Sequence, residues 1–155
     1  MLFQSRFILR PVSRAYLIVL LGLFFTTSKV YGDDTISLFN VNGQAEAYIT
    51  PDKTIYLWSG KPLAYLYSDH HRAGESIYGF NGKYLGWFEQ GLARDRKGDK
   101  TCGIKNTVRS TRLESLKSLK ELKPLKALRE LPPIRPLIHN RWSDTSCSVF
   151  LSRGR

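Results

Sequence analysis

Residues 55–66, IYLWSGKPLAYL, and residues 77–88, IYGFNGKYLGWF, are two copies of one pattern, and this pattern decides the fold. In each copy a glycine and the residue before it separate two runs rich in Tyr, Trp, Phe, Leu and Ile. Aromatic and β-branched residues suit a half-buried strand, and two such runs joined by a short turn containing glycine are typical of a β-hairpin. Each copy is therefore predicted to form one hairpin.

Two further copies flank this pair, at residues 38–49 (LFNVNGQAEAYI) and, in divergent form, at residues 93–104 (ARDRKGDKTCGI). Asn-Gly, which occupies the turn of two copies, is the dipeptide most typical of a two-residue type I′ turn, where both central residues need positive φ. Ser-Gly and Lys-Gly in the other two copies are weaker examples. The sequence thus predicts four consecutive hairpins within residues 33–106, with turn glycines Gly43, Gly60, Gly82 and Gly98.

The fourth residue after each turn glycine is small: Ala47, Ala64, Gly86 and Cys102. A small residue at equivalent positions indicates a crowded place where related strands approach one another. Because a single hairpin is marginally stable in water, the four must pack together, and a pseudo-fourfold arrangement satisfies this. The predicted fold class is all-β, with four consecutive hairpins and an extended basic tail.

Three stretches carry a resemblance to a known family: TIYLWSGKPLAYL at 54–66, SIYGFNGKYLGWFEQG at 76–91 and RDRKGD at 94–99. With the Leu-Lys triplets that follow, they resemble the 4-fold beta flower domain family of small bacterial proteins, whose function is uncharacterised. The resemblance is close over residues 37–104, and the tail is similar in style. It implies hairpins that radiate like petals from a common centre, and it supplies no catalytic residue.

The tail, residues 107–139, has an aliphatic residue at every third position from Leu113 to Leu137. A row with this period wraps around an α-helix and alternates faces on a strand, whereas polyproline II has three residues per turn and keeps the row on one edge. Four prolines favour this extended form. The alternative is a short helix over residues 112–123, because Thr111 and Glu114 have capping-box spacing.

Two interpretations of the tail compete. In the first, the leucines cover the outside of the hairpins and the basic row faces solvent. In the second, the tail projects and its basic row follows an anionic membrane or polymer. The two are compatible, because adjacent edges point in different directions. The residues predicted to bind an anionic partner are Lys117, Lys120, Lys123, Lys126, Arg129 and Arg135.

Residues 1–32 have the three parts of a secretory signal peptide: Arg6, Arg10 and Arg14, the apolar run 15–25, and a polar segment ending at Gly32. The apolar run is shorter than the about 20 residues that span a bilayer. We therefore predict an exported protein, periplasmic or extracellular. The alternatives are an uncleaved N-terminal anchor that tethers the protein to a membrane, and a misassigned start codon.

Export bears on Cys102 and Cys147, the two cysteines of the chain. An oxidising compartment lets them form a disulfide that ties residues 140–155 back to the hairpins. The alternative is two buried thiols. The segment WSDTSCSVF, residues 142–150, is interpreted as a short returning strand.

Two sets of residues are weaker site candidates. The loop between the second and third hairpins holds His70 and His71, which can bind zinc and would then point to a metal-dependent enzyme, although a solvated turn is the preferred explanation. Aromatic residues of the petals can stack on sugars or bases, although their alternation also fits core packing. These aromatic residues are Tyr56, Trp58, Tyr78, Phe80 and Trp87.

The functional prediction follows from charge and from the motifs present. The chain has a formal net charge of +11, and removal of residues 1–32 leaves +7, which favours an anionic partner. Without a P-loop, a dinucleotide-binding fingerprint, an HExxH helix or a GxSxG elbow, catalysis has no positive support. We predict a non-catalytic binding or structural module without cofactor, which contacts an anionic membrane or polyanion. The alternative is self-assembly or a protein partner at the leucine edge.

Overall fold

The fold is seen in a computed structural model that describes residues 34–69 and 74–155. The predicted signal peptide and the residues His70 and His71 lie outside this part of the chain. Eight strands follow one another from residue 36 to residue 103, and each is hydrogen-bonded to its neighbours. They are β1 (Ile36–Phe39), β2 (Ala45–Ile49), β3 (Thr54–Leu57), β4 (Pro62–Ser68), β5 (Glu75–Gly79), β6 (Tyr84–Glu89), β7 (Leu92–Asp95) and β8 (Lys100–Gly103).

The strands form a closed antiparallel barrel, which confirms the predicted all-β fold of four hairpins. Closure comes from pairing of β1 with β8, where Phe39 lies opposite Gly103. Inside the barrel, alternate residues of the strands form one apolar cluster. Ala47, Ala64 and Cys102, three of the four small residues, are fully buried in it. At the fourth position, a Cβ on Gly86 would lie 1.8 Å from the Arg94 carbonyl oxygen.

The hairpin turns differ from the prediction of two-residue type I′ turns. In the first hairpin Asn40 N–H donates to Gln44 O and Gly43 N–H donates to Asn40 O, so the loop has three residues, 41–43. The same pair of bonds recurs in the other three hairpins. Only the glycine has positive φ (71° at Gly43), since Asn42 and Asn81 keep negative φ. This is a type I turn followed by a glycine bulge. A separate register shift lies further along each hairpin, between Leu38 and Phe39 in the first.

After β8 come a short 3-10 helix, η2 (Lys105–Thr107), then the tail, and finally α2 (Cys147–Ser152). The returning strand predicted over residues 142–150 is therefore wrong for its second half. Ser146 caps the helix by accepting a hydrogen bond from Val149 N–H, and Trp142 alone makes a bridge, to Lys100. Phe150 and Leu151 are buried in the barrel core. None of the helices in the described ranges is long and apolar enough to cross a membrane.

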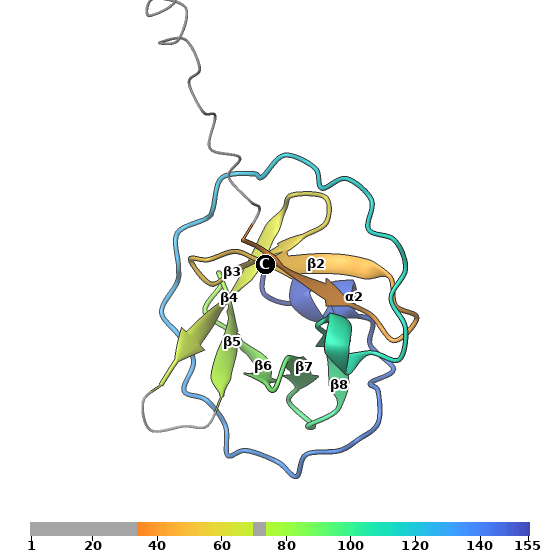
Figure 1. The fold of residues 1–155 in the computed structure, drawn as a ribbon. Helices are drawn as coiled ribbons and strands as arrows, with labels where there is room; N and C mark the ends of the chain where they lie inside the picture. Colours follow the sequence, from red (N-terminus) through yellow and green to blue (C-terminus); the bar gives the residue numbers. More distant parts are fainter. Residues whose placement is uncertain (1–33, 70–73) are drawn as a thin grey trace, which may run out of the picture. The chain divides into compact units, whose positions relative to one another are not determined.

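A disulfide joins Cys102 on β8 to Cys147 on α2, and the structure therefore contains the first of the two alternatives for these cysteines. Between them, residues 109–139 leave the barrel and run around all four hairpins before returning to α2 (Figure 1). Neither a helix nor a strand occurs in this segment, so the short helix considered for residues 112–123 does not form. The tail is thus a ring of chain without helix or strand around the barrel.

Candidate functional site

The tail is attached to the barrel at points nine residues apart. The turn glycines Gly43, Gly60, Gly82 and Gly98 each accept one hydrogen bond, from the N–H groups of Arg112, Glu121, Glu130 and His139 respectively. Their N···O distances are 2.8–3.2 Å. Three triplets of the tail therefore correspond to one hairpin, and the triplet repeat matches the fourfold repeat of the barrel.

Glycine is required at these turns for closeness as well as for φ. A Cβ on Gly60 would lie 1.9 Å from the carbonyl oxygen of Leu119, and a Cβ on Gly82 would lie 2.0 Å from that of Leu128. The backbone of the tail therefore rests directly on the turns. Arg112, Glu121 and Glu130, each of which directly precedes a leucine, point their N–H groups towards the barrel. The side chains of the leucines that follow them therefore point away from it.

The aliphatic row is the exposed edge of the tail. Its side chains are between 83% and 101% exposed, so the interpretation that the leucines bury apolar surface on the hairpins is wrong. Backbone attachment at the turns fixes this orientation, since it leaves the leucine edge on the far side of the chain. We call these side chains the leucine belt: Leu113, Leu116, Leu119, Leu122, Leu125, Leu128, Leu131, Ile134 and Leu137.

The basic row lies against the barrel instead of facing solvent freely. Lys117 Nζ is 5.0 Å from the ring centroid of Tyr48, and Lys126 Nζ is 4.0 Å from that of Tyr65. The guanidinium of Arg129 is 3.8 Å from the ring of Tyr67. Cations at these positions are attracted by the aromatic quadrupole. The stems and charges of the basic row therefore help to hold the tail in place.

Two basic residues reach carboxylates at the loops of the barrel. Lys123 binds Asp52, in the loop between β2 and β3, and Arg135 binds Glu89 at the end of β6. Lys120, the remaining base of the row, lies 5.7 Å from the Tyr48 ring centroid. All six bases predicted to bind an anionic partner thus have partners within the barrel.

The predicted stacking platform is covered by the tail. Tyr56, Tyr78, Phe80 and Trp87 are at most 5% exposed, and Trp58 is half-buried. Tyr78 Oη donates to the carbonyl oxygen of Glu130 at 3.1 Å, and Trp58 Nε1 donates to that of Ser115 at 3.2 Å. These rings form an aromatic layer between barrel and tail, which leaves no open ring face for a sugar or base on the four buried residues.

The Lys123–Asp52 contact makes attachment of the tail sensitive to acid. Hydrogen bonds from Lys123 and from the Thr50 hydroxyl hold the pKa of Asp52 well below its usual range. Because the folded pKa is depressed, the stabilisation is fully present above the unfolded value of about 3.9 and is lost as pH falls towards the folded value. We expect Asp52→Asn to lower the free energy of unfolding at pH 7, and the difference from wild type to shrink below about pH 4.

Denaturant unfolding between pH 7 and pH 2.5 measures this difference. Glu75→Gln is a poor control because Glu75 also binds a lysine, Lys53. Asp34→Asn is a better control, since it changes a carboxylate on an exposed residue outside the strands. A constant gap between wild type and Asp52→Asn across the whole pH range would contradict the assignment.

The described residues contain no group of three or more His, Cys, Asp and Glu side chains that could hold a metal ion. The weak metal candidates His70 and His71 fall outside those residues and stay a prediction. The leucine edge was predicted as a docking surface only in the alternative of self-assembly or a protein partner, although its period of three was visible. Its orientation depends on which edge the turns bind, and the sequence alone does not contain that information.

Comparisons with known proteins add one finding. The model of the family described as 4-fold beta flower protein matches residues 36–151, which span the barrel, the tail and nearly all of α2. No curated protein and no solved structure matches the chain.

Proposed function

The chain belongs to the 4-fold beta flower family, and we propose that it is a non-catalytic binding module that docks on an anionic membrane surface through its leucine belt. The observation that carries this proposal is the near-complete exposure of nine aliphatic side chains in one continuous row. Full burial of one leucine is worth about 1.5–3 kcal/mol, and extended apolar surfaces on soluble proteins mark sites of interaction.

The spacing within the belt favours lipid over a rigid protein partner. We infer a polyproline II conformation for the tail, in which residues three apart are separated by about 9 Å along the chain. Side chains at this spacing leave gaps between them, and a protein partner must fill each gap with a matching side chain. Acyl chains are fluid and fill such gaps without a matched surface.

The charge of the tail is complementary to anionic lipid. Residues 109–139 contain eight Lys and Arg residues and three Glu residues. The bases that rest on aromatic rings lie one residue from the belt along the chain. Basic residues near an anionic membrane contribute about 1 kcal/mol each, and the contribution falls with added salt. In this proposal the leucines insert, and the bases attach the tail to the barrel while they draw it to the surface.

We expect the double substitution Leu122→Ser and Leu125→Ser to weaken binding to vesicles of mixed phosphatidylcholine and phosphatidylserine. Each leucine is 95% or more exposed, so its removal costs the folded protein little. Loss of about 1 kcal/mol of partial insertion per leucine lowers the partition coefficient about 30-fold. Co-flotation of the full chain with vesicles, at several lipid concentrations, gives this coefficient.

The matched control is Ile36→Ser with Val149→Ser, because these aliphatic residues are half exposed and lie outside the belt. All variants share residues 1–33, so a difference between them reports the belt. Equal partition coefficients for the belt and control variants would refute the proposal. Sedimentation that shows concentration-dependent assembly, lost in the belt variant, together with weak vesicle binding, would assign the belt to self-assembly instead.

The proposed location is outside the cytoplasm, in the periplasm or the extracellular space. The sequence of residues 1–32 and the Cys102–Cys147 disulfide support it, because disulfides persist in oxidising compartments. Uncleaved, the same residues would tether the barrel to the membrane that the belt is proposed to contact.

A further inference from the structure

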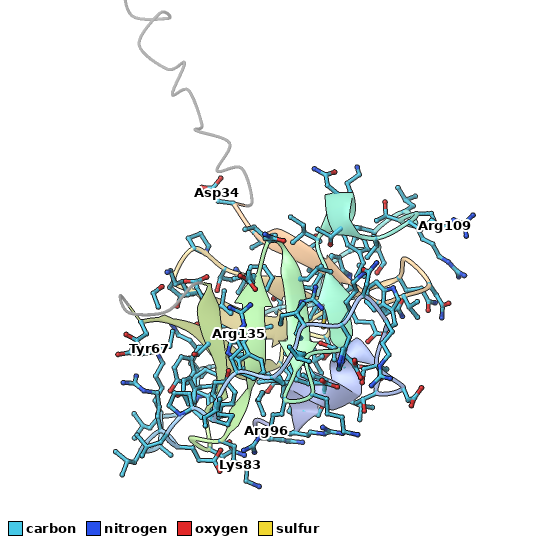
Figure 2. The ribbon with its side chains drawn as sticks, turned by 90° about the horizontal axis from the view of Figure 1, so that it is seen from below. Asp34, Tyr67, Lys83, Arg96, Arg109 and Arg135 are labelled. Atoms are coloured by element: carbon cyan, nitrogen blue, oxygen red, sulfur yellow. A yellow bond between two sulfur atoms is a disulfide. The ribbon has the colours of Figure 1, made fainter. Side chains whose placement is uncertain are left out.

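Three basic side chains from separate elements line one hollow between the third and fourth hairpins. Lys83 directly precedes β6, Arg96 lies in the loop between β7 and β8, and Arg153 follows α2. The hollow has a volume of about 320 Å³, and Tyr84 and Leu85 complete its lining. Figure 2 labels Lys83 and Arg96 at the same end of the barrel, the end opposite Asp34.

The backbone that carries these side chains is held firmly. Asn81 Nδ2 donates to the carbonyl oxygen of Arg153 at 3.0 Å, which ties the end of α2 to the third hairpin. Gly154 packs against Gly79 so closely that a Cβ on Gly154 would lie 2.6 Å from Gly79 Cα. Lys83 and Arg153 are therefore kept as neighbours by contacts that do not involve their charges.

Carboxylates balance this group of charges only in part. Glu130 is the acid beside the hollow, where its Oε2 atom accepts a hydrogen bond from Tyr84 N–H at 2.8 Å and lies 4.0 Å from Arg96 Nη1. Arg153 Nη2 donates to a neutral group, the hydroxyl of Thr145, at 3.3 Å. Among the described residues, neither Lys83 nor Arg153 forms an ion pair.

Three acids line an adjoining hollow together with Arg96 and Arg153, namely Asp95, Asp99 and Asp144. Asp144 interacts electrostatically with Arg141, and the other two acids are engaged by hydrogen bonds. Asp99 binds Arg141 and His139, and Asp95 accepts hydrogen bonds from Ser143 Oγ and from backbone N–H groups. An excess of positive charge thus remains at the hollow. Two guanidinium groups and one ammonium group provide directed donors of the kind that suit a phosphate-type oxyanion.

We propose that Lys83, Arg96 and Arg153 form a binding site for a phosphate-type oxyanion. The site differs from the leucine belt, since its residues lie outside the tail, and it stands whether or not the belt docks on lipid. A free phosphate and the phosphomonoester headgroup of a lipid present the same chemistry to these donors, and the experiment below separates them.

The first arm titrates the full chain with inorganic phosphate at low ionic strength and follows backbone amide NMR shifts. We expect saturable shifts at Tyr84 and Arg153, and none around Lys61, the residue that follows the turn glycine of the second hairpin as Lys83 follows that of the third. The double variant Lys83→Gln with Arg153→Gln is expected to bind phosphate at least tenfold more weakly, and the matched control Lys61→Gln to bind it as wild type does.

The second arm compares vesicles that contain phosphatidic acid with vesicles of equal charge that contain phosphatidylserine. Tighter binding to phosphatidic acid, lost in the double variant and competed by inorganic phosphate, identifies a lipid headgroup as the source. Equal binding to both vesicles, with phosphate binding intact, identifies a soluble phosphate. Linear shifts without saturation, or a double variant that binds phosphate like wild type, would overturn the proposal, and the wild-type titration decides this even where a variant folds poorly.

Discussion

Replacement of both Cys102 and Cys147 by serine is expected to lower the free energy of unfolding by about 4 kcal/mol. The disulfide joins residues 45 apart in sequence and encloses the whole tail in its loop. A cross-link of this span removes much of the chain entropy of the unfolded state. Both residues are fully buried, so the bond also secures the apolar face of α2 against the barrel core.

Urea unfolding followed by tryptophan fluorescence measures this loss, with reduced wild-type protein as the control for the substitutions themselves. The reduced protein and the serine variant should unfold at similar urea concentrations, well below the midpoint of the oxidised protein. A serine variant as stable as the oxidised protein would show that tail contacts and helix packing hold the C-terminal segment without the cross-link.

Substitution Gly60→Ala is expected to destabilise the protein by about 3 kcal/mol and to release the tail at the second hairpin. Alanine at φ near 85° costs about 1–2 kcal/mol. Its Cβ would lie 1.9 Å from the Leu119 carbonyl oxygen, so the tail must move away and lose the hydrogen bonds of Ser118 and Glu121 to this turn. Each such bond contributes about 1 kcal/mol. Limited trypsin digestion should then cut after Lys117 or Lys120 faster than in wild type.

Gly74→Ala is the matched control, because Gly74 has a similar φ of 78° while its Cβ would meet the strand residues Phe88 and Glu89 instead of the tail. It should share the conformational cost and leave the cleavage rate in the tail unchanged. Faster cleavage of the tail in both variants would attribute the effect to general destabilisation of the barrel, and it would remove the special role of the turn in docking.

The barrel was predictable because its signals are local and repeated. A glycine in each turn, a small residue four positions later and the aromatic flanks of three copies defined four hairpins, and the structure has a strand on either side of each turn glycine. The turn type was wrong because Asn-Gly is compatible with two kinds of loop. In the structure Asn42 keeps negative φ, and only Gly43 adopts the left-handed conformation.

The orientation of the tail on the barrel was not predictable from the sequence. The period of three placed the leucines on one edge and the bases on another, and it could not say which edge meets the barrel. That choice depends on carbonyl groups of the turns, which accept hydrogen bonds from Glu121 and its equivalents. Apolar side chains usually go inside, and one of the two interpretations accordingly placed the leucine edge on the barrel. Here an aromatic layer already covers the barrel, and the cations of the basic row bind it.

The C-terminal segment was misread for a related reason. Residues 142–150 have the aromatic and β-branched composition of a strand, yet the barrel is closed by β1 and β8, and pairing of this segment with β8 is limited to the bridge between Trp142 and Lys100. Ser146 instead begins a short helix whose Phe150 and Leu151 enter the core. The hollow lined by Lys83, Arg96 and Arg153 could not have been found from spacing, because its residues come from three distant segments.

The nine-residue interval between the attachment points gives the tail a phase, comparable to a reading frame, that it shares with the hairpins. Loss or gain of one residue in the tail would shift every later attachment point and turn the leucine edge towards the barrel. Loss of one triplet would keep the leucines outside but would leave each later donor three residues out of place relative to its turn. Only a change of nine residues, matched by the removal or addition of a whole hairpin, preserves both. Tail length and hairpin number should therefore change together. Natural variants of this fold are expected to gain or lose one whole hairpin together with three triplets of the tail.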